Sequence, residues 1–407
     1  MPSVESRTAI DTLVLTLVYP HQVSYYDDWL DAFVASADFR CTVLNILGLS
    51  AVELRRALER AEAIIVLHSC NADTLDYLRQ VAPVLGDRRR GKLLAFVGNE
   101  YNSPYLSTRE RVSLLRSARC DIIATQLLDE AGQYLYAATG AQVASVPHAL
   151  NPSVFKSSIS SANCRPIDVG IRGYRYPAFL GDDDRNRLLI RVSETCPAFG
   201  LSTDMVEDVR LDRARWAEFL GRCNGTVSTE AGSWFIEPDD VLMSRIRAYL
   251  DKQRRGAVIR SDTPLRRLVR RLPVSIKVML WKILRHGPIR LDQLDDINMP
   301  FAELESLFFR TAPRPPVYGK AVSSRHFDAI GTKTCQIMLR GRFNDILVAD
   351  EHYISIAPGY GNLEHAITLF KDPDHRRRIV DGAYDHVMSA HTHVHRVRLV
   401  RDLLEAG

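Results

Sequence analysis

Several signatures of well-known function classes are missing from this sequence of 407 residues. Neither G-x-G-x-x-G nor G-x-x-x-x-G-K-[ST] occurs, which argues against a dinucleotide-dependent dehydrogenase and a P-loop nucleoside triphosphatase. No run of 18 or more apolar residues exists, so no transmembrane helix is expected. Residues 1–20 lack a basic n-region and a small-residue cleavage site, so they do not resemble a signal peptide.

The cysteines give no sign of a disulfide framework. No C-x-x-C pair occurs, and the number of cysteines is odd. In a chain of this size that pattern is typical of reduced thiols in a cytoplasm, where most are small buried hydrophobes. The seven stand singly, at Cys41, Cys70, Cys120, Cys164, Cys196, Cys223 and Cys335.

The charge balance argues against a nucleic-acid partner. A net charge of +4 is too small to indicate one, and the sequence is 46% hydrophobic and 25% charged, as in a soluble globular protein. We therefore expect a cytoplasmic protein. The distribution of its basic residues is more informative than their sum.

Length and pattern predict two α/β domains. A chain of this length exceeds one ordinary hydrophobic core. In residues 1–150, continuous apolar strands alternate with amphipathic helices, which is the signature of a doubly wound parallel sheet. The strands expected there include 12–19, 63–69, 92–98 and 121–126. We interpret this part as an N-terminal Rossmann-like domain.

A second α/β unit follows a polar linker. Residues 151–166 are rich in Ser, Pro and Asn, and the α/β pattern then restarts and continues over 167–390. Residues 391–407 form a closing helix in this interpretation. Two tandem α/β domains leave a cleft between them, which the carboxyl ends of their strands face.

A basic segment interrupts the second domain at 245–316. Residues 245–290 carry 14 Lys or Arg against two Asp, and 264–288 are apolar and basic together. We interpret the segment as a helical insertion with three alternative roles. It is a cover packed on the core, a surface for an anionic polymer, or an amphipathic surface for anionic lipid at the inner face of the membrane.

The stretch 317–339 has the composition of a phosphate site. A helix expected to begin near residue 323 offers unpaired N–H groups and a positive dipole end to an anion. On physical grounds alone, an ordinary capped helix is the better explanation of the same residues. The candidate ligands are Lys320 and Arg325 by charge, Ser323 and Ser324 by their hydroxyls, and Asp328 as an acceptor for a ribose, with Gly331 as the helix stop.

From about residue 317 to 404 the chain resembles the C-terminal domain of group 1-type glycosyltransferases of the CgeB-like branch. In that family an R-x-F-E-A-x-x-x-G helix precedes a strand, and a helix of the H-T-x-x-x-R type closes the domain. The counterparts here are Arg325, Phe327, Asp328, Ala329 and Gly331, then "CQIML", then His391, Thr392 and Arg396.

The resemblance implies a GT-B fold that binds a nucleotide-sugar donor in its C-terminal domain and an acceptor in its N-terminal domain. It also implies no bound metal and no cofactor apart from the donor itself. Segments 144–155 and 167–173 resemble the end of the first domain and the first strand and glycine turn of the donor domain, including Arg172 and Gly173. The sequence departs from the family where Asp328 replaces the usual Glu. The paired glutamates eight positions apart are also absent, which leaves retention or inversion of configuration open.

Two further sets of polar residues are candidates for the site. In the loop 225–240, Glu230 could accept a hydrogen bond from a sugar hydroxyl, Gly232 could let the backbone approach the ligand, and Trp234 could stack on it. A loop with a purely structural role fits the same residues equally well. In the N-terminal domain His68, Glu100 and His148 each follow an expected strand, where α/β folds place their chemistry. Each is a candidate base for an acceptor hydroxyl and each also has a structural interpretation.

The histidines near the C-terminus do not indicate a metal site. On a helix His391 and His395 share a face, whereas His393 points away, and no Cys or carboxylate completes a ligand set. The favoured function is transfer of a hexosyl or related sugar to a glycan, lipid-linked or small-molecule acceptor. The alternatives are a nucleotide-sugar epimerase or hydrolase, and a non-catalytic protein with a degenerate donor site and a basic binding surface.

Overall fold

The computed structural model describes residues 8–406 except 20–25, 89, 158–164, 174, 208, 210, 254–256, 292–299 and 260–288 apart from 276 and 279. The basic stretch 264–288 therefore lies almost entirely outside the described residues, and its role as a membrane surface stays a prediction. No helix in the described ranges combines the length and the apolar character needed to cross a bilayer.

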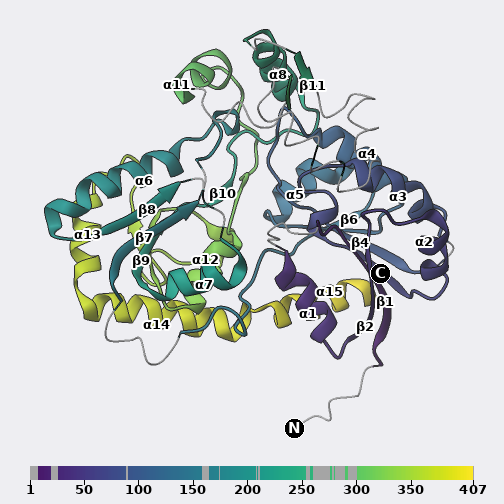
Figure 1. The fold of residues 1–407 in the computed structure, drawn as a ribbon, viewed down its shortest axis with the longest axis horizontal. Coiled ribbons are helices and arrows are strands. Elements are labelled where there is room, and N and C mark those ends of the chain that lie inside the picture. The colour runs from purple at the N-terminus through teal and green to yellow at the C-terminus, as the bar shows by residue number, and fades with distance from the viewer. Residues whose placement is uncertain are drawn as a thin grey trace.

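The N-terminal domain is built on a parallel sheet of order β2-β1-β3-β4-β5-β6. Its strands β3 and β5 are buried throughout and mostly apolar, because helices cover both faces of the sheet (Figure 1). The strands are β1 Ile10–Thr16, β2 Phe39–Asn45, β3 Ala63–Val66, β4 Lys92–Phe96, β5 Ile122–Thr125 and β6 Gln142–Ser145. The helices are α1 Asp27–Ala35, α2 Ala51–Leu58, α3 Asp76–Gly86, α4 Thr108–Ser117 and α5 Asp129–Tyr136.

The C-terminal domain contains a second parallel sheet, of order β15-β14-β9-β7-β8. Its strands are β7 Ile167–Gly173, β8 Thr203–Glu207, β9 Cys223–Ser228, β14 Cys335–Leu339 and β15 Ile354–Ile356. Its helices are α6 Asp184–Thr195, α7 Arg213–Gly221, α12 Ser324–Gly331, α13 Leu363–Lys371 and α14 Pro373–Ala390. The two Rossmann-like domains expected from the sequence are confirmed, and this is the arrangement that the GT-B fold requires.

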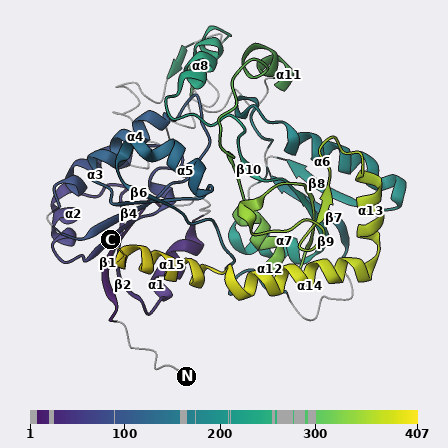
Figure 2. The same ribbon diagram turned by 180° about the vertical axis from the view of Figure 1, so that it is seen from behind.

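The last helix returns to the first domain. Helix α15, His393–Glu405, lies beneath the N-terminal sheet in both views (Figures 1 and 2). Val397, Val400 and Leu404 pack in one apolar cluster with Trp29 and Phe33 of α1. The chain therefore crosses between the domains twice, once after β6 and once between α14 and α15.

A small helical unit sits above both domains (Figure 1). It contains α8 Val241–Gln253, α11 Phe301–Leu304 and a π-helical turn at Glu305–Phe309, which share an apolar cluster with Phe179 and Phe235. Two short sheets accompany it: β10 Ala231–Gly232 pairs with β13 Lys320–Ala321, and β11 Ala257–Ile259 pairs with β12 Ile289–Leu291.

The carboxyl ends of the two sheets meet. Asn344, which follows β14, donates a hydrogen bond from Nδ2 to the backbone oxygen of Gln126, which follows β5, at 2.9 Å. A second contact joins the domains at α4, where the Asp240 carboxylate accepts from the backbone N–H groups of Thr108 and Arg109 at 3.0 and 2.9 Å. The polar residues that follow each sheet's strands therefore lie near the domain boundary.

Candidate functional site

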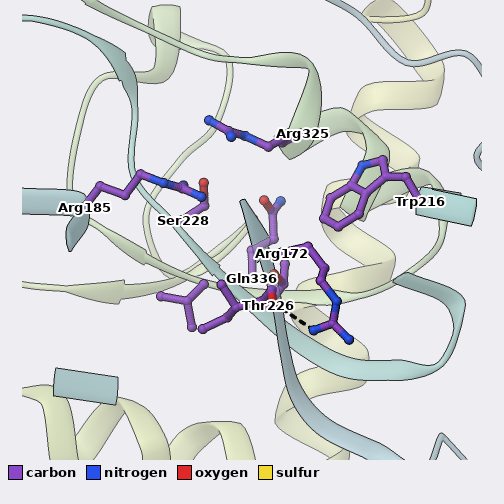
Figure 3. A pocket seen from close by; sticks show the side chains of 9 residues that line it. Arg172, Arg185, Trp216, Thr226, Ser228, Arg325 and Gln336 are labelled. Carbon is purple, nitrogen blue, oxygen red and sulfur yellow. Dashed lines mark hydrogen bonds between the residues drawn. The ribbon is translucent and has the colours of Figure 1, made fainter. Parts of the chain in front are cut away.

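A small pocket lies against strands β7, β9 and β14 of the C-terminal sheet, close to the carboxyl ends of β7 and β9 and beside Gln336 near the start of β14. From β7 the chain continues to β8 on one side and later to β9 on the other, so this is the switch point where α/β sheets bind ligands. Figure 3 shows Arg185, Arg325 and Trp216 around Ser228 and Gln336. The lining residues are Ile171, Arg172, Arg185, Trp216, Thr226, Val227, Ser228, Arg325 and Gln336.

Arg185 is the most unusual of these residues. It is the second residue of α6, and only 3% of it is exposed. Its Nε and Nη1 atoms are buried without a hydrogen-bond partner, and no ion pair involves it among the described residues. Burial, followed by the charge of Arg325, lowers the pKa of its guanidinium to about 10, so it still carries its charge at neutral pH.

Arg325 approaches the same space from α12. Its Nη2 donates a hydrogen bond to the Tyr176 hydroxyl at 3.0 Å, and Arg185 lies over the Tyr176 ring with its Cζ 5.2 Å from the centroid. Burial alone would raise the pKa of this hydroxyl, but Arg325 and Arg185 outweigh it and the pKa lies below its ordinary value. No carboxylate pairs with Arg325 in the described part of the chain.

Arg185 is buried and Arg325 is partly buried, and neither pairs with a carboxylate among the described residues, so an anion bound between them would balance both charges. A buried charge is stable only when it is paired, and Arg presents donors in a geometry that matches phosphate oxygens. The Gln336 Oε1 atom in the same pocket is also buried without a partner. The space between these side chains is about 10 Å³, roughly the room of one water molecule. The lining side chains must therefore move apart to admit a larger ligand. We call this space the anion pocket.

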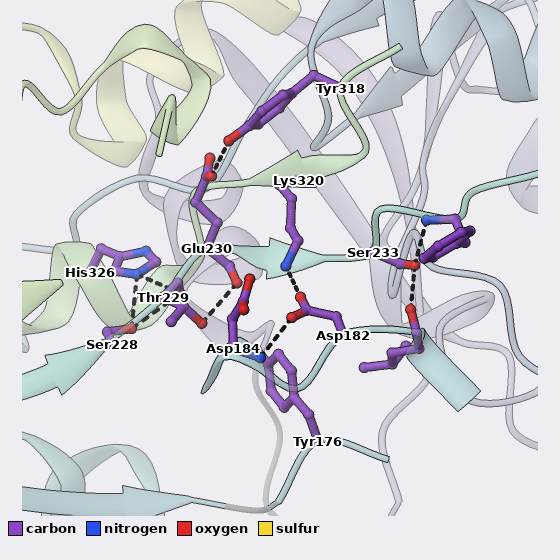
Figure 4. A network of polar contacts seen from close by, with 12 residues as sticks. Tyr176, Asp182, Asp184, Ser228, Thr229, Glu230, Ser233, Tyr318, Lys320 and His326 are labelled. Atoms are coloured by element: carbon purple, nitrogen blue, oxygen red, sulfur yellow. Dashed lines mark hydrogen bonds and ion pairs between the residues drawn. The ribbon is translucent and has the colours of Figure 1, made fainter. Parts of the chain in front are cut away.

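His326 fixes α12 against the sheet in its neutral form. Its Nδ1 accepts from the backbone N–H of Ser323 at 2.9 Å, so the ring proton is on Nε2, which faces Thr229 O at 3.2 Å and Ser228 Oγ at 2.9 Å (Figure 4). Burial, Arg325 and Arg185 together lower its pKa to about 3. The ring therefore positions the helix without adding a charge.

The helix predicted over the phosphate motif is present. Ser323 is its N-cap, Ser324 opens it, and Gly331 ends it. Gly331 was expected to end the helix through a left-handed backbone conformation, but the left-handed residue that follows the helix is Lys333, with φ 54°. A Cβ at Gly331 would lie 2.5 Å from Phe155 O, so glycine is needed here to let the interdomain segment pass close to the helix.

Asp328 lies on α12 but is not among the residues that line the anion pocket. Its Oδ2 accepts from Trp216 Nε1 at 3.0 Å, and that indole ring does line the pocket. Burial and the nearby carboxylate of Asp28 raise the pKa of Asp328 well above its ordinary value. Its expected role as a ribose acceptor stays a prediction, while its contact with Trp216 is clear.

Lys320 and Glu230 both have partners within the protein (Figure 4). The Lys320 ammonium forms a buried ion pair with Asp182 and lies 5.0 Å from the Trp234 ring centroid, which adds a cation–π contact. One oxygen of Glu230 accepts from the Tyr318 hydroxyl, and the other accepts from Phe343 N at 2.6 Å. Burial raises the pKa of Glu230. The charges of both residues are thus balanced or hydrogen-bonded without a ligand.

The remaining C-terminal candidates lie on strands. Arg172, the next-to-last residue of β7, lines the pocket, but its guanidinium is paired with Asp204 at 2.8 Å and lies 4.0 Å from the Phe219 ring centroid. A Cβ at Gly173 would lie 3.0 Å from Arg185 Nη2, so glycine leaves room for that guanidinium. Gly232 has φ 94°, and a Cβ there would lie 2.4 Å from Gly319 O.

The structure brings two of the three candidate bases together. His68 and His148 stack with ring centroids 5.6 Å apart, in a cluster with Tyr26 and Trp29. Neither ring nitrogen of His68 has a hydrogen-bond partner in the described ranges, whereas His148 Nδ1 accepts from Trp29 Nε1 at 3.2 Å. Burial lowers the pKa of both, to about 4 for His148.

Glu100 lies in a separate polar group of the same domain. Its carboxylate accepts from Thr125 Oγ1 at 2.6 Å and from Gln126 N at 2.5 Å. Burial raises its pKa to about 7. That value suits a general base, although both oxygens already accept hydrogen bonds from the protein.

The C-terminal histidines form stacks rather than a ligand set. His352 and His386 stack at 4.4 Å, and His386 lies 5.0 Å from His391. His393 turns away from them and lies edge-on to Trp29 at 4.8 Å. Within the described ranges, no group of three or more His, Cys, Asp or Glu is arranged to hold a metal ion.

Sequence reasoning missed Arg185, Tyr176 and Trp216. One signal was available for Arg185, because an arginine in the first turn of the first helix after β7 opposes the helix dipole. A bound anion would offset this unfavourable interaction between the arginine and the helix dipole. Nothing local indicated that Trp216, in a helix more than 100 residues before α12, would reach the same pocket.

Comparison with known proteins adds a family match. Residues 307–402, about a quarter of the chain, match a family model described as glycosyl transferase-like. No curated protein sequence matched the chain. The last part of the C-terminal domain, including α12 and Arg325, is therefore similar to glycosyl transferases.

Several solved structures are distantly similar to this chain. HepE of Anabaena, solved with UDP-glucose, has 10% identity and a TM-score of 0.48 over 98% of this chain and 100% of that chain. Sucrose-phosphate synthase of Thermosynechococcus elongatus has 11% identity and a TM-score of 0.45 over 98% and 100%. The N-terminal domain of trehalose-6-phosphate phosphatase of Candida albicans has 10% identity and a TM-score of 0.44, over 98% of this chain and 98% of that chain. These likenesses are too remote to assign a function.

Proposed function

We propose that the protein transfers a sugar from a nucleoside-diphosphate sugar to an acceptor hydroxyl, with the diphosphate held in the anion pocket. The observation that carries this proposal is the pair Arg185 and Arg325, two guanidinium groups without a carboxylate partner in the described chain. The glycosyl transferase-like match over 307–402 supports the same conclusion, because it includes Arg325.

The pocket residues would act mainly on the leaving group. Negative charge develops on the departing diphosphate as the bond to the sugar breaks, and fixed cations in a site shielded from water stabilise that charge most. Arg185 is rigidly placed by burial and Arg325 by its bond to Tyr176. Trp216 offers an indole ring at the pocket wall, and Asp328 holds that ring in place.

The acceptor side belongs to the N-terminal domain in this proposal. Among its three candidate bases, Glu100 has the pKa closest to neutrality, about 7. We keep His68 and His148 as candidates, although burial holds both rings in the neutral form. The proposal includes four further points. The protein belongs to the CgeB-like branch, its acceptor is a glycan or glycolipid, it needs no metal, and it attaches to the membrane surface through 264–288.

A thermal-shift screen tests the donor site. The protein is heated with UDP, GDP, ADP, CMP or dTDP and with their common sugars, because a ligand that binds only the folded state raises the melting temperature. The expected result is a shift with one nucleotide class that Arg325→Ala abolishes and Arg187→Ala retains. Arg187 is the control because it lies on the same helix as Arg185 but is exposed and paired with Asp183 at 3.6 Å. No shift with any nucleotide would refute the transferase.

Product analysis separates the transferase from its rivals. Incubation with the donor that binds, with and without a panel of sugar and lipid acceptors, distinguishes a new glycoside from free sugar or an epimer. Donor binding without turnover on any acceptor would favour a non-catalytic protein that uses its basic segment as the working surface.

A further inference from the structure

Three consecutive residues after β14 adopt the left-handed backbone conformation. The φ angles of Phe343, Asn344 and Asp345 are 47°, 55° and 58°. Left-handed residues other than glycine normally occur singly, because the Cβ atom approaches the following carbonyl oxygen. Strained backbone of this kind persists only where surrounding contacts over-determine it, and it concentrates at functional sites. We call residues 342–345 the left-handed turn.

On one side the left-handed turn holds the approach to α12. Asn344 Oδ1 accepts from Val322 N at 2.7 Å, one residue before the N-cap Ser323. The Phe343 ring lies edge-on to His326, with centroids 5.1 Å apart. These contacts fix the segment that leads directly to Arg325, so the turn supports one wall of the anion pocket.

On its other side the left-handed turn contacts the N-terminal domain. Asn344 Nδ2 donates to Gln126 O at 2.9 Å, and Arg342 Nη1 donates to Glu130 Oε1 at 3.1 Å. One side-chain amide, that of Asn344, therefore binds both domains at once. Arg342 also pairs with Asp345 inside the turn, from Nε to Oδ1 at 2.9 Å.

We propose that the left-handed turn couples the relative position of the two domains to the anion pocket, with Asn344 as the positioning residue. When the domains separate, the turn loses Gln126 and Glu130, and only contacts within the C-terminal domain, such as that of Phe343 N with Glu230, still hold its strained backbone. Val322 and the first residues of α12 then lose their fixed place. By reciprocity, an anion that fixes Arg325 favours the docked domains. The inference rests on the proposed function only in treating the pocket at Arg325 as the phosphate site.

Two variants cut the contacts to the N-terminal domain and leave the pocket residues intact. Asn344→Asp keeps an acceptor for Val322 N and tolerates the left-handed conformation, but it places a carboxylate oxygen against Gln126 O. Glu130→Ala removes the partner of Arg342. The control is Arg109→Ala, which removes an exposed interdomain hydrogen bond to Asp239 O, 2.7 Å long, that does not involve the turn.

Binding of inorganic pyrophosphate, measured by isothermal titration calorimetry, tests the coupling. Asn344→Asp is expected to weaken binding about three- to tenfold, the loss of one interdomain hydrogen bond. Glu130→Ala is expected to weaken it about twofold, and Arg109→Ala to leave it unchanged. Electrostatics alone predicts the opposite sign for Glu130→Ala, because removing a negative charge favours an anion. Wild-type affinity in Asn344→Asp, or tighter binding in Glu130→Ala, would overturn the proposal.

A ligand-free measurement separates this inference from the proposed function. Hydrogen–deuterium exchange by mass spectrometry over residues 318–331 should be faster in Asn344→Asp than in the wild type, and unchanged in Arg109→Ala. If the wild type binds no pyrophosphate, the phosphate site fails but this exchange still decides the coupling. Unchanged exchange in Asn344→Asp would refute the coupling whether or not the pocket binds an anion.

Discussion

Arg325 donates a hydrogen bond to the hydroxyl of Tyr176 at 3.0 Å, on the ring that Arg185 covers. This contact joins α12 to the loop after β7, two segments about 150 residues apart in the sequence. It also holds two positive groups close together where repulsion would otherwise separate them. An anion between them would relieve that repulsion, once the pocket has opened enough to admit it.

Replacing Arg185 should separate ligand binding from stability. Arg185→Met keeps an unbranched apolar stem and removes the guanidinium with its charge, so affinity for a nucleoside diphosphate should fall about tenfold to 100-fold. The free energy of unfolding should stay the same or rise, because a buried unpaired charge is removed. Calorimetry and urea unfolding measure the two effects. Equal loss of affinity in Arg187→Ala would contradict the role of Arg185.

Asp328→Asn tests the ribose interaction without altering the phosphate site. The amide oxygen can still accept from Trp216, so the fold should be maintained. If Asp328 binds ribose, the variant weakens UDP or the preferred nucleotide about threefold to tenfold, the loss of one hydrogen bond to the ribose. Pyrophosphate affinity should not change. Equal loss for both ligands would assign Asp328 to pocket structure instead.

Stability should decrease in acid because several buried histidines are neutral. Burial lowers the pKa of His393 and His326 to about 3 and that of His148 to about 4, below the ordinary value of 6.5. The unfolded chain therefore binds more protons, so stability is full above pH 6.5 and is lost as the pH falls toward 4. Each histidine contributes a slope of up to about 1.4 kcal/mol per pH unit.

Urea midpoints between pH 8 and pH 4.5 measure this slope. His393→Phe should flatten it, because that ring packs edge-on to Trp29 without a partner for Nδ1. His365→Gln, at an exposed position, is the control. A slope that His393→Phe leaves unchanged would show that the cluster around Trp29 is not its source.

Gly232→Ala should destabilise the chain more than its backbone angle alone requires. Gly232 and Gly359 have similar φ angles, 94° and 84°, but only Gly232 has a close neighbour, Gly319 O at 2.4 Å from an added Cβ. We expect Gly359→Ala to cost about 1 kcal/mol and Gly232→Ala at least twice as much. Thermal unfolding of both variants checks the difference, and equal costs would exclude the clash between β10 and β13.

The central strands and the domain division could be predicted from the sequence because buried parallel strands are continuous apolar runs. The strands β6 and β8 were not identified, and each lies at the edge of its sheet. Edge strands face solvent, so their sequences, QVAS and TDMVE, carry polar residues that hide the pattern.

The site was only partly predictable for a similar reason. Arg325 and its helix follow from a local motif, so the sequence indicated them. Arg185 and Trp216 line the pocket and Tyr176 contacts Arg325 beside it, from three separate segments that only the folded chain brings together. Lys320 has the composition of a phosphate ligand, but Asp182, 138 residues earlier, pairs with its charge. Residue type cannot reveal such a partner.

A crystal structure with the nucleoside diphosphate selected by the thermal-shift screen would show directly whether Arg185 and Arg325 bind the diphosphate. The account predicts diphosphate oxygens within hydrogen-bond distance of both Arg185 and Arg325, with Tyr176 still in contact with Arg325. A nucleotide bound elsewhere, or a saturated crystal in which Arg185 remains without an anionic partner, would contradict it.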